Sequence, residues 1–146
     1  MSMHRIHLFI SHSWAYSGHY DTLRSWIFER SWSVGRTPLA FSDFSVPRDN
    51  PVHNAGSDQL LQAAIYLRID RSHVVICPTG MYANHSKWIR KELAGAKAKR
   101  KLILGVDPWG QKRRSSVVGG AARETVGWNG KSVVEGIWRC FLETGY

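Results

Sequence analysis

Short apolar runs alternate along this chain with longer stretches whose apolar residues recur at helical spacing. The short runs cover residues 6–10, 39–42, 74–77, 102–106 and 125–127, and we expect each to form a β-strand. Most of them are apolar throughout, rather than alternately apolar and polar. Strands of that kind, alternating with helices, are typical of a parallel sheet that is covered on both faces.

The longer stretches predict helices over residues 17–32, 57–69, 86–98 and 132–141. Ser57 or Asp58 is a suitable N-cap for the second of these helices, and Ser86 for the third. The turn formers at 47–51 predict a loop. We therefore expect the α/β class, as a flavodoxin-like three-layer sandwich with a five-stranded parallel sheet in the order 2-1-3-4-5, and a single domain over residues 1–146.

In a sheet of this kind, ligands bind beyond the carboxyl ends of the strands, at the point where the strand order reverses. Here that point lies between the first and third strands, and the segments that reach it are 11–14, 43–46 and 78–92. Their polar and aromatic side chains are the candidates for a binding or catalytic site.

Glu92 is the most informative residue of these segments. It is the only acid between Asp70 and Asp107, in a strongly basic part of the chain. On a helix its neighbours in space lie three and four positions away, and none of them is basic: they are Trp88, Ile89, Gly95 and Ala96. This pattern favours a carboxylate that is kept for chemistry over one that balances a surface charge.

The chain is basic, with 20 Lys and Arg against 11 Asp and Glu and a net charge of +9. Clusters at 97–101 and 112–114 leave three interpretations open: solvated cations at a helix end, an anionic ligand or partner, or nucleic acid. A typical nuclease needs a compact acidic cluster for a metal ion, and Asp43, Asp49 and Glu92 are too scattered to form one. We therefore predict no metal site, and we do not expect nucleic acid to be the partner.

Cys77 and Cys140 are the two cysteines, and they indicate neither a disulfide framework nor a zinc site. Cys77 lies in an apolar run, which predicts a buried thiol. The apolar run near the N-terminus is too short for a signal peptide or a membrane span. We expect a cytoplasmic protein that does not associate with membranes.

Six short motifs, in this order, resemble those of the bacterial TIR-like domains, the group that includes the TIR proteins of Thoeris anti-phage systems. They lie at 9–14 (FISHSW), 43–47 (DFSVP), 80–82 (GMY), 88–93 (WIRKEL), 105–110 (GVDPWG) and 126–129 (VGWN). The resemblance covers almost the whole chain, and it implies the same flavodoxin-like fold as the pattern of apolar residues.

Many TIR domains cleave NAD at the nicotinamide–ribose bond, and some cyclise the product into a signalling nucleotide. Their catalytic glutamate follows a tryptophan by four residues at the start of a helix, and Trp88 and Glu92 fit this pattern. The resemblance implies an NAD glycohydrolase or ADP-ribosyl cyclase-like enzyme of anti-phage defence. NAD would be its substrate rather than a cofactor, a separate effector would respond to the product, and the oligomeric state stays open.

Around Glu92 the resemblance and the strand ends together suggest a substrate-binding set: Ser11, His12, Trp14, Asp43, Ser45, Tyr82 and Trp88. Ser11 and His12 would contact phosphate or ribose. Trp14 would stack on a base, and Asp43 would hold a ribose hydroxyl. Ordinary roles as turn, cap or core residues stay open for most of them. A TIR domain that signals by assembly without catalysis also stays open, because fold does not fix function.

Overall fold

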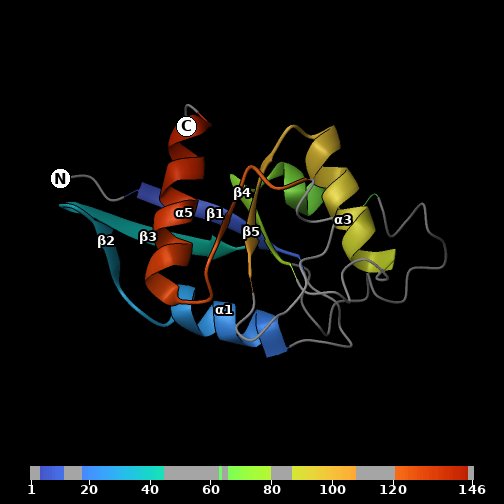
Figure 1. Ribbon diagram of the computed structural model, residues 1–146. Coiled ribbons are helices and arrows are strands. Elements are labelled where there is room, and N and C mark those ends of the chain that lie inside the picture. The colour runs from blue at the N-terminus through green and yellow to red at the C-terminus, as the bar shows by residue number, and fades with distance from the viewer. Residues whose placement is uncertain are drawn as a thin grey trace.

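The computed structural model describes residues 4–11, 18–44, 63, 66–79, 87–107 and 121–144, and it contains a mostly parallel sheet with helices on both faces (Figure 1). The strands are β1 (His4–Ile10), β2 (Trp32–Val34), β3 (Thr37–Asp43), β4 (Val74–Pro78), β5 (Leu102–Val106) and β6 (Glu124–Val126). The helices are α1 (Gly18–Phe28), α3 (Lys87–Ala98) and α5 (Gly130–Glu143), and residues 66–70 are helical as well.

The sheet has six strands in the order β2-β3-β1-β4-β5-β6. β1 pairs in parallel with β3 on one side and with β4 on the other, and β5 pairs in parallel with both β4 and β6. The α/β class and the mostly parallel sheet are thus confirmed. The predicted strand count and complete strand order are wrong, because an additional strand, β2, pairs antiparallel with β3 at the edge of the sheet.

The additional strand lies where a helix was expected to continue. α1 ends at Phe28, and Trp32 and Val34 are then separated by one serine, which is the two-residue period of a strand. Val34 pairs with Thr37, so that two residues form the hairpin turn. The first of them, Gly35, has a φ of 61°, a left-handed conformation that such a turn requires and that glycine adopts at little cost.

The closing helix begins earlier than its apolar pattern predicts. Asn129 is the N-cap of α5, and its side chain accepts a hydrogen bond of 2.8 Å from the backbone N–H of Ser132, the residue with which the predicted helix began. α3 follows the prediction closely, although its expected N-cap, Ser86, lies outside the described residues. Of the predicted helix 57–69, the structure describes 63 and 66–69, and all of these are helical.

One side of the sheet packs against α1 and α5 (Figure 1). The buried residues there include Leu8, Val74 and Leu104 of the strands, Leu23 of α1 and Ile137 of α5. These contacts form the larger part of the described core.

The opposite side of the sheet carries α3 and the helical segment 66–70 (Figure 1). Its buried strand residues, such as Phe9 and Val75, alternate in sequence with those of the first side. α3 packs closely there, because a Cβ atom on Gly95 would lie only 2.7 Å from the ring of Tyr66. The face of α3 that carries Glu92 is therefore buried in the protein.

Candidate active site

The end of β1 supplies the first residue of the site. Ser11 follows Ile10 directly, and its backbone N–H donates a hydrogen bond of 2.7 Å to the carbonyl oxygen of Ile76 in β4. This bond extends the contact between β1 and β4 by one residue and holds Ser11 at the carboxyl edge of the sheet. The Ser11 side chain is fully buried.

Helix α3 supplies the second residue from its buried face. The exposed fractions of Glu92, Leu93 and Ala96 are 0%, 3% and 0%, and their spacing puts all three on the face that turns toward the core. An acid thus occupies a place where the helix otherwise carries apolar residues. Because burying a carboxylate costs free energy that packing alone does not return, its presence there indicates a purpose other than packing.

The two residues meet although 81 positions separate them in the sequence. Ser11 Oγ donates a hydrogen bond of 2.8 Å to Glu92 Oε1. A Glu92 side chain on the outer face of α3 would have excluded the expected catalytic role. The structure instead places the carboxylate against the end of β1, at the edge of the sheet where the fold predicts a ligand.

A thiol lies beside this pair. Burial raises the pKa of Cys77 in β4, a hydrogen bond with Ser11 opposes the shift, and the nearby Glu92 adds to it. The thiol is therefore protonated at neutral pH and a poor nucleophile. The complete burial of Cys77 confirms the buried thiol predicted from the sequence. The thiol is an uncharged neighbour of the Ser11–Glu92 pair.

A second polar pair lies along the same edge, at the ends of β4 and β5. The Thr79 hydroxyl donates to Oδ1 of Asp107, and the backbone N–H groups of these two residues donate to the carbonyls of Val106 and Val126, each at 2.9 Å. Thr79 lies in the segment 78–92 that was expected at this edge, whereas Asp107 was not among the expected site residues. Both residues directly follow an apolar strand, and that position is the signal that could have found them.

The other expected substrate contacts lie only partly in the described chain. Asp43 ends β3, the neighbour of β1, and its exposed side chain shares the carboxyl edge with Ser11. The backbone of Trp88 belongs to α3, one turn before Glu92, while its side chain is outside the described part. Four further residues lie outside the described ranges, so that their roles stay predictions: His12, Trp14, Ser45 and Tyr82.

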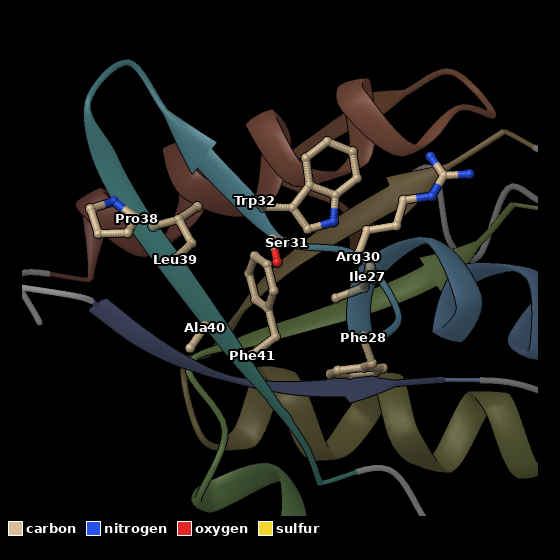
Figure 2. Close-up of a pocket in the computed structure, with 9 residues that line it drawn as sticks. All are labelled: Ile27, Phe28, Arg30, Ser31, Trp32, Pro38, Leu39, Ala40 and Phe41. Atoms are coloured by element: carbon tan, nitrogen blue, oxygen red, sulfur yellow. The ribbon is translucent and has the colours of Figure 1, made fainter.

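A pocket of about 370 Å³ lies elsewhere, between α1, β2 and β3. Figure 2 shows the side chains of Ile27, Trp32 and Phe41 pointing toward a common space, while that of Arg30 extends away from it. No carboxylate is among the described residues that line this pocket. The Ser11–Glu92 pair therefore stays the better candidate for an active site.

The polar groups described at the carboxyl edge are carboxylates, hydroxyls and one thiol. Within the described ranges, no group of three or more His, Cys, Asp and Glu residues is arranged to hold a metal ion. None of the helices in the described part has both the length and the hydropathy that a bilayer span needs.

The family model for the TIR-like domain of the Thoeris protein ThsB matches residues 9–113. The chain belongs to this family. The match confirms the resemblance that the motifs indicated. It also covers the residues described at the carboxyl edge of the sheet, which are Ser11, Asp43, Cys77, Thr79, Glu92 and Asp107. β6 and α5 lie beyond the matched range of the ThsB domain. No curated protein matches the chain.

Proposed function

We propose that this ThsB-family domain cleaves the nicotinamide–ribose bond of NAD and makes a cyclic, ADP-ribose-derived signalling nucleotide in anti-phage defence. Its family supports the defence setting. The observation that carries the catalytic part is the buried Glu92 carboxylate, held by Ser11 at the carboxyl edge of the sheet. We further propose that the reaction takes place in the cytoplasm and that a separate effector responds to the product.

The chemistry of NAD suits a site with one buried carboxylate. When nicotinamide leaves, positive charge develops on C1 of the ribose, as in the oxocarbenium-like transition states of glycosidases. A fixed carboxylate in a site that excludes water stabilises this charge more strongly than one in solvent. The nicotinamide ring is positively charged in NAD and leaves as a neutral molecule, so no general acid is needed. An ordinary glycosidic bond, by contrast, calls for a pair of carboxyl groups.

The product depends on what captures the ribosyl carbon. A hydroxyl of the same molecule forms a new C1–O bond, loses its proton and closes a ring, whereas water gives linear ADP-ribose. Because Glu92 is fully buried, the proposal requires that substrate binding uncovers its carboxylate. A site that opens for substrate and then closes also keeps water from competing with the hydroxyl.

The test is the release of nicotinamide by purified Glu92→Gln protein and by the wild type, each prepared from cells with and without phage challenge. Glutamine keeps the shape and the hydrogen bond from Ser11 but removes the charge. We expect turnover to fall by roughly 100-fold or more, as when one stabilising group is removed from other sites. Glu29→Gln, the same change at an exposed residue after α1, is the matched control and should leave turnover unchanged.

Mass spectrometry of the product separates cyclic from linear ADP-ribose in the same reactions. Equal turnover by wild type and Glu92→Gln protein would exclude Glu92 as the catalytic group. If challenged wild-type protein releases no nicotinamide but still confers defence, and Glu92→Gln confers it equally, the domain signals by assembly instead.

A further inference from the structure

A second solvent-open cavity lies at the other end of the sheet from Glu92. It has a volume of about 390 Å³ and is lined by His73, Lys99, Arg100, Lys101 and Thr144. His73 precedes β4, the three cations form the turn from α3 into β5, and Thr144 follows α5. In Figure 1 the last turns of α3 and α5 lie at the same end of the molecule as the start of β5. Three separate parts of the chain thus converge on this amino edge of the sheet.

Little negative charge faces these cations among the described residues. Lys99 Nζ lies 3.9 Å from Asp70 Oδ1, a long contact between half-exposed side chains that contributes little. Glu143, which precedes Thr144, is engaged by the Arg123 guanidinium through hydrogen bonds of 2.8 and 3.0 Å. Among the described residues, the three cations that line the cavity are therefore not balanced by acids.

Several carbonyl groups at the two helix ends already accept hydrogen bonds from the chain itself. At the end of α3, Arg100 N donates to Lys97 O at 3.1 Å and Lys101 N donates to Ala96 O at 2.9 Å, which is the Schellman pattern. At the end of α5, both the backbone N–H and the hydroxyl of Thr144 donate to Phe141 O.

The turn keeps an arginine where a helix end favours glycine. Arg100 has a φ of 57° and is the only non-glycine residue in the described part with a left-handed backbone. A side chain in this conformation costs roughly 1 kcal/mol, which is why glycine is common at this position of a Schellman motif. The Arg100 side chain lines the cavity. The strained backbone therefore coincides with a place where a cation can bind an anionic ligand.

His73 presents a donor rather than an acceptor. Its Nδ1 accepts a hydrogen bond of 2.9 Å from the backbone N–H of His7, so that the proton of the neutral ring sits on Nε2. Lys99, Arg100 and Lys101 also carry N–H donors, whereas the hydroxyl proton of Thr144 is already donated to Phe141 O. Such a lining matches the oxygen acceptors of a phosphate.

We propose that this amino-edge cavity binds an organic phosphate of nucleotide size, through Arg100, Lys101 and Lys99 with His73 as a further donor. The volume exceeds that of a single phosphate and lies in the range of small-molecule sites. The cationic side chains converge on one cavity and do not form a stripe along the surface. This arrangement favours a small molecule over a nucleic-acid backbone. The site is remote from Glu92 and does not depend on the proposed NAD chemistry.

The test is isothermal titration of the whole protein with ATP and with tripolyphosphate, without magnesium, at about 0.15 M salt, where weak surface pairing is screened. We expect saturable binding of one molecule per chain, weakened about tenfold or more by Arg100→Gln, which removes a charge-assisted contact. Arg24→Gln, a matched loss of charge at an exposed position in α1, should leave the affinity unchanged.

Arg100→Gly separates binding from folding. Glycine relieves the left-handed backbone, so this variant should be at least as stable as the wild type and still lose affinity. The proposal is overturned if neither probe binds saturably, or if Arg24→Gln weakens binding as much as Arg100→Gln. A loss of ATP binding in Glu92→Gln but not in Arg100→Gln would place the ligand at the carboxyl edge. Tighter binding of a short oligonucleotide than of ATP, lost in Arg100→Gln, would make the occupant a nucleic acid.

Discussion

Glu92 is an acidic side chain on the face of α3 that otherwise buries apolar residues. A buried carboxylate is expensive even when it is hydrogen-bonded, and replacing such groups by apolar ones often stabilises a protein. Leu93 and Ala96 show what the same face of the helix carries elsewhere. The free-energy cost of burying an acid beside Ser11 is what one expects of a group with the catalytic role proposed for Glu92.

Ser11→Ala tests whether the hydroxyl positions this acid. The variant removes the 2.8 Å hydrogen bond and leaves Glu92 Oε1 buried without that donor, so we expect a loss of about 1–3 kcal/mol in the free energy of unfolding. A less well-oriented carboxylate should lower kcat by roughly 10-fold or more, with a smaller change in KM. Urea titration and nicotinamide-release kinetics measure the two effects. The exposed Ser33→Ala should change neither. An unaltered kcat in stable Ser11→Ala protein would leave Ser11 with a structural role only.

Single residues also show how far the sequence leads. Glu92 is identifiable from its neighbours on the helix, and Ser11 from its place directly after an apolar run. The contact between these two residues depends on how α3 packs on the sheet. The local sequence pattern carries no information about that packing. The Thr79–Asp107 pair depends likewise on the register of β4 against β5, where Pro78 pairs with Val106.

At the level of elements, the continuous apolar runs predict the parallel strands, but no such run predicts β2. Trp32 and Val34 continue the series of apolar positions of the preceding helix. These residues therefore fit both the helical period and the two-residue period of a strand. The hairpin turn at Gly35 and the pairing with β3 favour a strand at these residues. Trp32 is then fixed by its indole N–H, which donates to Trp26 O at 2.8 Å.

The close approach of α5 to the sheet at Gly136 gives a prediction at this level. A Cβ atom on Gly136 would lie 2.9 Å from Leu104 Cδ1 and 3.1 Å from Val126 Cγ1, and Leu104 is fully buried. Gly→Ala normally stabilises a helix by about 0.5–1 kcal/mol. Here the overlap should dominate, and we expect Gly136→Ala to lower the free energy of unfolding by about 1–3 kcal/mol.

Chemical denaturation followed by circular dichroism measures the change, and Lys131→Ala on the exposed face of α5 is the control, with an expected effect near zero. A Gly136→Ala protein more stable than the wild type would show that α5 can move away from β5 without loss.

Among the described residues, the side chains at the two edges of the sheet differ in their chemistry. Carboxylates and hydroxyls gather at the carboxyl edge, and cations with His73 gather at the amino edge. The sequence shows both sets of residues, and the parallel arrangement explains their separation, because every parallel strand begins at one edge and ends at the other. The net charge of +9 alone would not have revealed this division.

The amino edge should also make stability depend on pH through His73. Its pKa lies below the ordinary value of 6.5 because the ring is partly buried and because His7 and Lys101 disfavour a further positive charge. The unfolded chain therefore binds a proton more readily than the folded one. It follows that the stabilising contribution of the neutral ring is present above pH 6.5 and is lost as the pH falls through the folded-state pKa. Protonation would also displace the hydrogen bond that Nδ1 accepts from His7 N.

His73→Asn isolates this effect, because the asparagine Oδ1 can accept the same hydrogen bond without titrating. We expect the urea midpoint of the wild type to fall more steeply than that of His73→Asn between pH 7.5 and 5. Any constant cost of the substitution, such as the lost contact between His73 and Phe141, shifts the whole curve without changing its slope. Contributions that do not involve His73 are common to both proteins and cancel in the comparison. Parallel curves would mean that His73 titrates alike in the folded and unfolded chains, contrary to its position between His7 and the cationic turn.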